Sequence, residues 1–277
     1  MLTLIPKRNG IWKALDFLTQ ILKDLPEIDA DTVKDFYYST LVPEGISISI
    51  VGDVDKDSII KSFELKFGDL KSDNPKCVTL SAGDIPQNKT VTIAKDDAAQ
   101  AQIIQGWIVS DIANEDCAKL SVLNTILGAS GLSSRLFTEL RDKKGLAYHV
   151  RSTYEPLKYS GIFSVYIGTA PNNIKTAKEG FDFEIKRLQD EPVSEKELEA
   201  AKSNHLGKRA FFHETNSQQA HYLGYYDILG LGPDYDEKIP EQIKKVTSQD
   251  IRDMANKCFS KNSVISILAP EKYLNNI

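Results

Sequence analysis

Two similar segments near opposite ends of the chain constrain the fold more than any other feature of the sequence. Ile28–Asp53 and Val246–Glu271 align without a gap at an offset of 218 residues, from 28 to 246. Both stretches are typical of a short helix, a turn and an apolar strand. Solenoid repeats recur about every 20–50 residues, so a period this long indicates that each repeated unit is a whole domain.

The repeat implies one complete domain and the end of another. If the second unit ends near the C-terminus, the first is represented only by its last portion. We therefore expect residues 1–72 to be a C-terminal remnant, residues 73–88 a linker with the polar, proline-containing character of a loop, and residues 89–277 a complete second domain. In the remnant we expect helices around Leu15, Leu18 and Ile21 and a strand at Gly45–Gly52, which lack sheet partners and invite self-association.

Hydrophobic periodicity beyond residue 89 predicts an α+β fold. Runs rich in β-branched residues predict strands, at residues 89–95, 101–109, 147–155, 161–170 and 263–269. Helical spacing, a first-turn proline at Pro171 and a Ser194–Glu197 capping box predict helices, over residues 114–130, 171–189, 194–212, 216–232 and 247–259. Strand pairs followed by several helices indicate an antiparallel sheet with helices packed on one face.

The segment Ser133–Tyr154 combines a helix, a glycine stop and a strand. Ser133 or Ser134 can cap the first turn. An apolar face at helical spacing follows, made of Leu136, Phe137 and Leu140. Gly145 stands where helices often end in left-handed geometry. This arrangement places Arg141 in the last turn and Tyr148 on the next strand, so both side chains could overhang one groove.

The run Ser134–Tyr148 resembles the second domain of the M16 zinc metallopeptidases, the insulinase, pitrilysin and mitochondrial processing peptidase-like family. The resemblance implies an M16-like (LuxS/MPP-like) fold. It also implies that Arg141 and Tyr148 occupy the family positions whose side chains hold the backbone of the peptide being cut. Taken singly, Arg141 is equally a favourable cation at a helix C-terminus, and Tyr148 an ordinary half-buried strand residue.

Four further residues are weaker candidates for peptide contact. Gly131 and Ser133 belong to a small-residue loop before the helix, which lacks the lysine and the spacing of a phosphate-binding loop. In the family a loop at this place borders the substrate chamber, although a tight turn that needs glycine explains Gly131 as well. Ser152 and Tyr154 suit a chamber wall, and strand alternation explains them equally.

The chain lacks the inverted zinc motif HxxEH on which M16 catalysis depends. Its four histidines are His149, His205, His213 and His221. The last three recur every eight residues, so in a helix neighbours would lie about 12 Å apart along the axis, too far for one ion with Zn–N bonds of about 2.1 Å. The family's zinc helix lies in the first domain, and its counterpart here, Ala118–Leu127, carries no His or Glu. We expect no cofactor in this chain, with zinc in the full-length enzyme or a partner subunit.

Composition excludes several other functions. A net charge of −5 and a pI near 5.5, without a basic tract, argue against nucleic acid as a partner. No apolar run approaches the roughly 18–20 residues of a membrane span, and the first residues lack the pattern of a secretory signal. Three widely separated cysteines, Cys77, Cys117 and Cys258, favour reduced thiols and a cytoplasmic location.

These observations lead to one main hypothesis and one alternative. The chain would be the non-catalytic, substrate-holding portion of an M16-type zinc endopeptidase, inactive alone. It would bind an extended peptide for hydrolysis by zinc from a missing N-terminal part or from a partner subunit, as a homo-oligomer or as a heterodimer with an active M16 chain. The alternative is a structural or assembly protein that keeps the fold without proteolysis.

Overall fold

The computed structural model describes residues 24–40, 42–43, 46–70 and 83–275. They belong to two units, each of which is described by itself. The first unit comprises Met1–Ser81 and Ala210–Asp236, and the second comprises Ala82–Arg209 and Glu237–Ile277.

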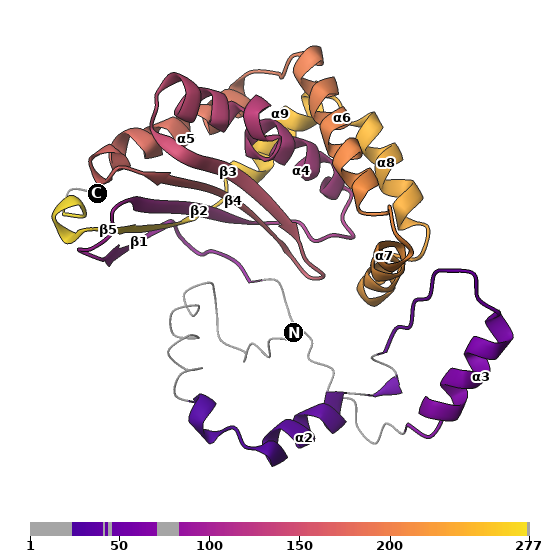
Figure 1. The fold of residues 1–277 in the computed structure, drawn as a ribbon. Coiled ribbons are helices and arrows are strands. Elements are labelled where there is room, and N and C mark those ends of the chain that lie inside the picture. Colours follow the sequence, from indigo (N-terminus) through magenta and orange to yellow (C-terminus); the bar gives the residue numbers. More distant parts are fainter. Residues whose placement is uncertain (1–23, 41, 44–45, 71–82, 276–277) are drawn as a thin grey trace. The chain divides into compact units, whose positions relative to one another are not determined.

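A five-stranded sheet forms the centre of the second unit (Figure 1). Its strands are β1 (Lys89–Ala94), β2 (Ala101–Val109), β3 (Ala147–Pro156), β4 (Gly161–Thr169) and β5 (Val264–Ala269). They lie in the order β1-β5-β2-β4-β3. All five strands were predicted within one residue at each end. The pairs β2–β4, β2–β5 and β3–β4 are antiparallel as expected, whereas β1 pairs with β5 in parallel.

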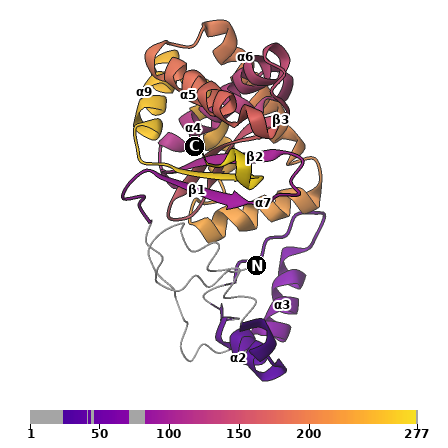
Figure 2. The same ribbon diagram turned by 90° about the vertical axis from the view of Figure 1, so that its left-hand side faces the viewer.

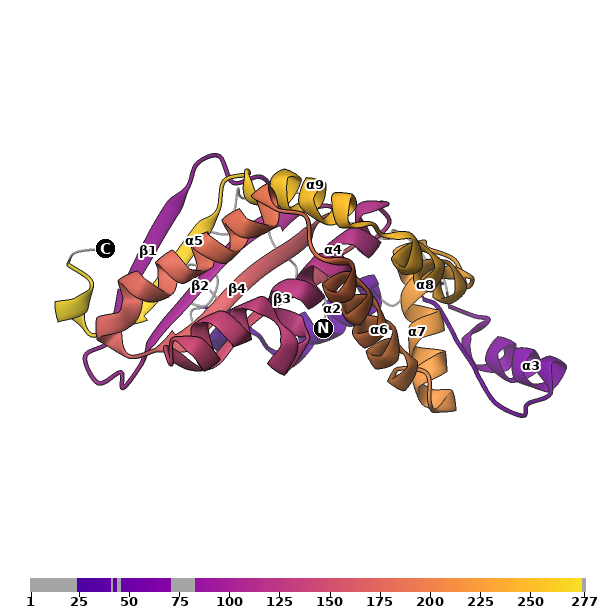
Figure 3. The ribbon, with the colours of Figure 1, turned by 90° about the horizontal axis from the view of Figure 1, so that it is seen from above.

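Helices cover one face of this sheet, as predicted. Figures 1 and 3 show α4, α5 and α9 across that face, and Figure 2 shows α5 and α9 on one side of β1 and β2. The main helices are α4 (Asp116–Asn124), α5 (Ile174–Asp190), α6 (Glu195–Phe211), α8 (Tyr235–Lys245) and α9 (Ser248–Phe259). Shorter turns are η3 (Thr125–Ala129), η4 (Gly131–Ser133), η5 (Phe137–Lys143), η6 (Pro171–Asn173) and η7 (Glu271–Tyr273). Helix α8 was not predicted; it contains Pro240, a residue that is usually disfavoured in the interior of a helix.

The hydrophobic core lies between the sheet and the helices. Alternate residues of β2 and β4 are buried against the helices, including Ile103, Trp107, Phe163, Val165 and Ile167. The helices meet them with their own apolar faces, such as Phe181 of α5 and Ile251 of α9. The period of two in the strands and of 3.6 in the helices therefore points both sets of side chains into one layer.

The first unit contains η1 (Leu25–Glu27), α2 (Ala30–Thr40), α3 (Lys56–Phe67) and α7 (Asn216–Leu229). The strand predicted at Gly45–Gly52 does not form over residues 46–51, which belong to no β-ladder. A strand needs a neighbour for its backbone hydrogen bonds, and no described residue supplies one. The helices predicted around Leu15, Leu18 and Ile21 lie outside the described residues, as does most of the predicted linker.

Candidate functional site

Arg141 and Tyr148 lie against each other at one end of the sheet. The guanidinium carbon of Arg141 is 5.1 Å from the centre of the Tyr148 ring and 4.5 Å from that of Phe137. The cation is therefore in contact with two aromatic rings, an arrangement that stabilises a guanidinium and limits its freedom. The two residues singled out in the sequence are brought together, one from η5 and the other from β3.

The turn between these elements follows from local sequence. The helix ends at Gly145, whose φ of 61° is the left-handed geometry expected of a glycine stop. The amide of Leu146 donates to the carbonyl of Leu140 at 2.9 Å, and both side chains are buried. The last turns, Phe137–Lys143, are π-helical, a rare form that is frequent at functional sites. Arg141 lies in this stretch.

Tyr148 occupies a β-bulge. Ala147 pairs with Thr169 and His149 pairs with Gly168, so Tyr148 is an extra residue on β3. The buried hydroxyl of Thr169 donates to the carbonyl of Leu146 at 2.6 Å and ties the start of the bulge to β4. Bulges re-aim side chains at sheet edges and next to active sites. Here the tyrosine ring projects from the edge strand and is 79% exposed.

The charge of Arg141 is not neutralised within the part of the chain that the structure describes. No described carboxylate forms an ion pair with it, whereas its helical neighbour Lys143 pairs with Glu139 at 2.7 Å. No described residue accepts a hydrogen bond from the Arg141 side chain either. Its guanidinium N–H groups and the exposed Tyr148 hydroxyl can therefore donate to a ligand, and carbonyl or carboxylate oxygens are the acceptors that suit them.

The weaker candidates separate into two groups. Gly131 and Ser133 are exposed, and Gly131 adopts a φ of +72°, which a tight turn requires. The Ser134 hydroxyl donates back to the carbonyl of Gly131 at 2.8 Å. Ser133 lines a cavity of about 280 Å³ against the start of α6, together with Ser130, Ser194 and Lys196. These loop residues could meet a ligand.

Ser152 and Tyr154 point to the helix-covered face instead. Ser152 is buried, and its hydroxyl donates to the carbonyl and the side-chain oxygen of Asn124 at 3.1 and 2.7 Å. Tyr154 is half-buried, and its ring stacks on Phe163 at 6.5 Å between centroids. Both side chains therefore connect β3 to the interior.

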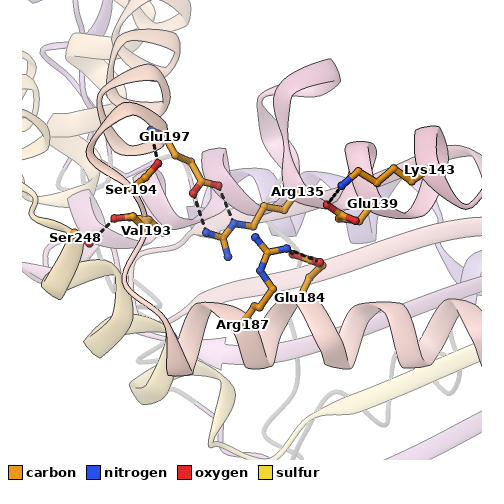
Figure 4. Close-up of polar contacts among 9 residues, drawn as sticks. All are labelled: Arg135, Glu139, Lys143, Glu184, Arg187, Val193, Ser194, Glu197 and Ser248. Carbon is orange, nitrogen blue, oxygen red and sulfur yellow. Dashed lines mark hydrogen bonds and ion pairs between the residues drawn. The ribbon is translucent and has the colours of Figure 1, made fainter.

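Pattern reasoning missed an ion pair between the buried Arg135 and the half-buried Glu197, which holds in place the helix that carries Arg141 (Figure 4). Arg135 is only 8% exposed and donates two hydrogen bonds to Glu197 of α6. Burial disfavours its charge, but the bond and the charge of Glu197 raise the pKa of the Arg135 guanidinium overall. The predicted capping box is consequently half formed: Ser194 accepts from the Glu197 amide at 3.2 Å, while the Glu197 carboxylate accepts from Arg135. The sequence signal for this pair was a charged residue, Arg135, directly before the apolar residues Leu136 and Phe137.

The described residues do not fit a zinc ion. No group of three or more His, Cys, Asp or Glu side chains among them is placed to hold a metal. The histidines lie on separate elements: His205 contacts Thr125 at 3.4 Å, and His213 lies 2.8 Å from Asp236. Burial, with help from two neighbouring cations, lowers the pKa of His205. In the described residues, no helix is long and apolar enough to cross a membrane.

The chain is similar to proteins of one family. A family model described as the peptidase M16 inactive domain matches residues 27–205. The uncharacterized zinc protease YmxG of Bacillus subtilis is 28% identical over 247 residues, which cover 89% of this chain and 59% of the relative. An uncharacterized zinc protease of Rickettsia felis is 30% identical over 226 residues, covering 80% and 53%. The chain thus spans little more than half the length of these relatives.

Solved structures share the fold. A protease from Helicobacter pylori matches with a TM-score of 0.75 at 22% identity, over 90% of this chain and 60% of that one. A peptidase M16 inactive domain from Pseudomonas fluorescens matches with a TM-score of 0.76 at 23% identity, over 90% and 59%.

Proposed function

Because the chain belongs to the peptidase M16 family, as its inactive domain, we propose that it holds an extended peptide by the main chain through Arg141 and Tyr148. Zinc and the general base would come from outside the described residues, either from another part of a longer protein or from a partner subunit. The chain would then be inactive alone and active only in combination.

One observation carries this proposal: a guanidinium stacked on two rings, with no described carboxylate to neutralise it, beside an exposed phenol on a bulge. Stacking on Phe137 and Tyr148 limits the orientations of Arg141, so its donors are arranged before a ligand arrives. Preorganised donors stabilise a polarised carbonyl and the negative charge that develops on it during hydrolysis, by about 3–4 kcal/mol where one such donor has been removed.

The internal repeat supports a further proposal, that residues 1–72 are the end of a first M16-like domain and 89–277 a second. Helix α2 is capped by Asp29, which accepts from the Thr32 amide at 2.8 Å. Helix α9 is capped by Thr247, which accepts from the Asp250 amide at 3.1 Å. These positions correspond at the offset of 218 residues, since 247 − 29 and 250 − 32 both equal 218. Both helices therefore begin with a side-chain cap at corresponding positions, which supports the proposal.

The two capped helices, α2 and α9, differ in how far their apolar faces are exposed. The face of α9 that includes Ile251, Met254 and Ala255 is buried against its own sheet. The corresponding residues of α2, Val33, Phe36 and Tyr37, are exposed, as are Ile46, Ile48 and Ile50 of the following segment. Exposed apolar faces of this extent favour a protein partner. We propose that a sheet from the rest of a longer protein, from an active M16 subunit or from a second copy covers them.

Peptide binding by the chain itself tests the main proposal. Fluorescence anisotropy with a labelled, unstructured peptide should give saturable binding that Arg141→Gln weakens about tenfold, the loss of one charge-assisted hydrogen bond. Tyr148→Phe should weaken it less, because the ring that stacks on Arg141 remains. Lys143→Gln, an exposed cation on the same turn, should change nothing. If the native chain and Arg141→Gln bind the peptide with equal affinity, Arg141 does not take part in peptide binding.

The same exposed faces on α2 and residues 46–50 favour the alternative, a structural or assembly protein. That function needs the partner but no peptide. If the chain assembles with a partner through these faces but shows no saturable peptide binding, the structural or assembly function is favoured. We propose a cytoplasmic location, supported by the thiol of Cys258, which is buried and forms no disulfide.

A further inference from the structure

The face of the sheet opposite the helices of the second unit carries a second arginine close to the bulge. Beyond Tyr148 the side chains of β3 alternate: Val150 and Ser152 are buried on the helix side, while His149 and Arg151 are exposed. Arg151 pairs across the strands with Tyr166 of β4. Tyr166 is half-buried, and its neighbours along the strand, Val165 and Ile167, are fully buried on the helix side. Arg151 and Tyr166 therefore share the face opposite the helices.

The Tyr166 ring forms the base of this cluster. The guanidinium carbon of Arg151 lies 5.6 Å from the centre of the ring, and the His149 ring lies 5.7 Å from it. The Tyr166 hydroxyl donates to the side-chain oxygen of Gln102 on β2. The ring is thus fixed at its tip by Gln102 and flanked by two basic side chains on β3.

A glycine keeps space open beside the cluster. Gly168 lies opposite the bulge, paired with His149. A Cβ atom built on Gly168 would lie 3.2 Å from the side-chain oxygens of Gln100 and Gln102 and 3.3 Å from the Tyr166 hydroxyl. These contacts are tighter than most Cβ contacts, so a side chain at position 168 would require the three polar groups to move by a few tenths of an ångström. Glycine at this position leaves them where they are.

The cluster carries positive charge that no described residue neutralises. Within the described ranges Arg151, like Arg141, forms no ion pair, although the chain as a whole has a net charge of −5. The carboxylate of Glu155 on the same strand face is about 13 Å along the strand, at 3.3 Å per residue. Asp97 pairs with Lys95, and Asp96 accepts from the backbone of Glu271. Two stacked, unpaired guanidinium groups thus flank the bulge.

We propose that Arg151, stacked on Tyr166, is a binding subsite for a carboxylate side chain, so that the peptide held at Arg141 and Tyr148 is acidic. The inference rests on the proposed function. β3 is an edge strand, and an extended peptide beside it places alternate side chains on one face, at the same spacing as His149 and Arg151. Arginine recognises a carboxylate through paired N–H donors, with a geometry that lysine cannot reproduce.

The test compares labelled peptides that share an Ala-Ser-Thr host sequence and carry Glu, Gln or Lys at one position, scanned along the peptide. With the full chain in fluorescence anisotropy, Glu at the matching position should bind about tenfold more tightly than Gln at low ionic strength. The preference should shrink as salt screens the exposed pair. Arg151→Gln should abolish the preference and leave the affinity for the Gln peptide unchanged. Arg151→Lys should retain only part of it.

Arg252→Gln, which removes an arginine from α9 in the helix layer, is the matched control and should keep the full preference. Arg151 is exposed, so its replacement should leave the far-ultraviolet circular dichroism and melting temperature unchanged. Equal binding of the three peptides, or a Glu preference that survives Arg151→Gln, overturns the acidic subsite while leaving the proposed function intact. Absence of binding by every peptide overturns both.

Discussion

Arg135 and Glu197 are joined by two parallel hydrogen bonds, Nε to Oε1 at 2.7 Å and Nη2 to Oε2 at 2.8 Å. Arg135 begins the helix that continues into η5 and carries Arg141, and Glu197 belongs to α6. Figure 4 shows a second pair beside it, in which Arg187 donates to the buried carboxylate of Glu184 on α5. The helix that presents Arg141 is therefore attached to α6 by a planar, two-point contact, which restricts its rotation as well as its position.

Breaking this pair should be costly. Glu197→Ala leaves the buried Arg135 guanidinium without its carboxylate. Removing one partner of a fully buried pair typically costs about 3–5 kcal/mol, and because the Glu197 side chain is 32% exposed we expect a loss at the lower end, about 3 kcal/mol. Asp190→Ala breaks the exposed pair with Lys186 and should cost about 0.3–0.5 kcal/mol. Urea unfolding of the two variants measures both values. A loss at Glu197 no larger than that at Asp190 would contradict the role given to the pair.

Gly128 should tolerate no side chain. A Cβ atom there would lie 2.1 Å from the backbone nitrogen of Ser152, because η3 packs directly on β3. Gly128→Ala should therefore destabilise the chain by about 1–3 kcal/mol through overpacking. Gly207 of α6 has open space around the same position, so Gly207→Ala should stabilise the helix by about 0.5–1 kcal/mol. Melting temperatures that shift in the same direction for both variants would refute this account.

Asp116 should contribute a pH-dependent share of stability. Burial opposes its charge, but hydrogen bonds from Lys257 at 2.5 Å and Ser110 at 2.8 Å hold the pKa of its carboxyl below the ordinary 3.8. A depressed folded-state pKa gives stability that is fully present above the unfolded pKa and is lost as the pH falls through the folded one. The stability difference between the native chain and Asp116→Asn, about 1–3 kcal/mol at neutral pH, should therefore shrink below pH 3.8. Urea titrations across this range measure it, and a difference independent of pH would be inconsistent with the pair.

The bulge should depend on Thr169. Thr169→Val keeps the shape of the side chain but leaves the buried carbonyl of Leu146 without its hydroxyl donor, at a cost of about 1–3 kcal/mol. Because this bond fixes the start of the bulge that presents Tyr148, peptide affinity should fall as well. Thr153→Val on the same sheet is the control and should change neither. If Thr169→Val is destabilised but binds the peptide with the affinity of the native chain, the bulge is not needed for peptide binding.

Much of the second unit could be predicted from sequence because the signals are local. The strands follow from β-branched runs with alternation, and most helices from apolar spacing and caps, each of which depends on a few neighbouring residues. Gly145 is left-handed where the helix was expected to end. Helix α8 was not predicted, and it forms around Pro240 because tertiary packing can keep a helix intact at a residue that local propensity disfavours.

By itself, then, the sequence determined the order of elements, the family resemblance through Ser134–Tyr148, and the absence of HxxEH in this chain. Only the tertiary structure decided which side chains meet. The bulge that adds Tyr148 to β3, the stacking of Arg141 on it and the burial of Ser152 all depend on register with β4 or packing against the helices. The Arg135–Glu197 pair joins residues 62 positions apart. Such contacts are set by how whole elements pack, and short-range patterns carry no information about them.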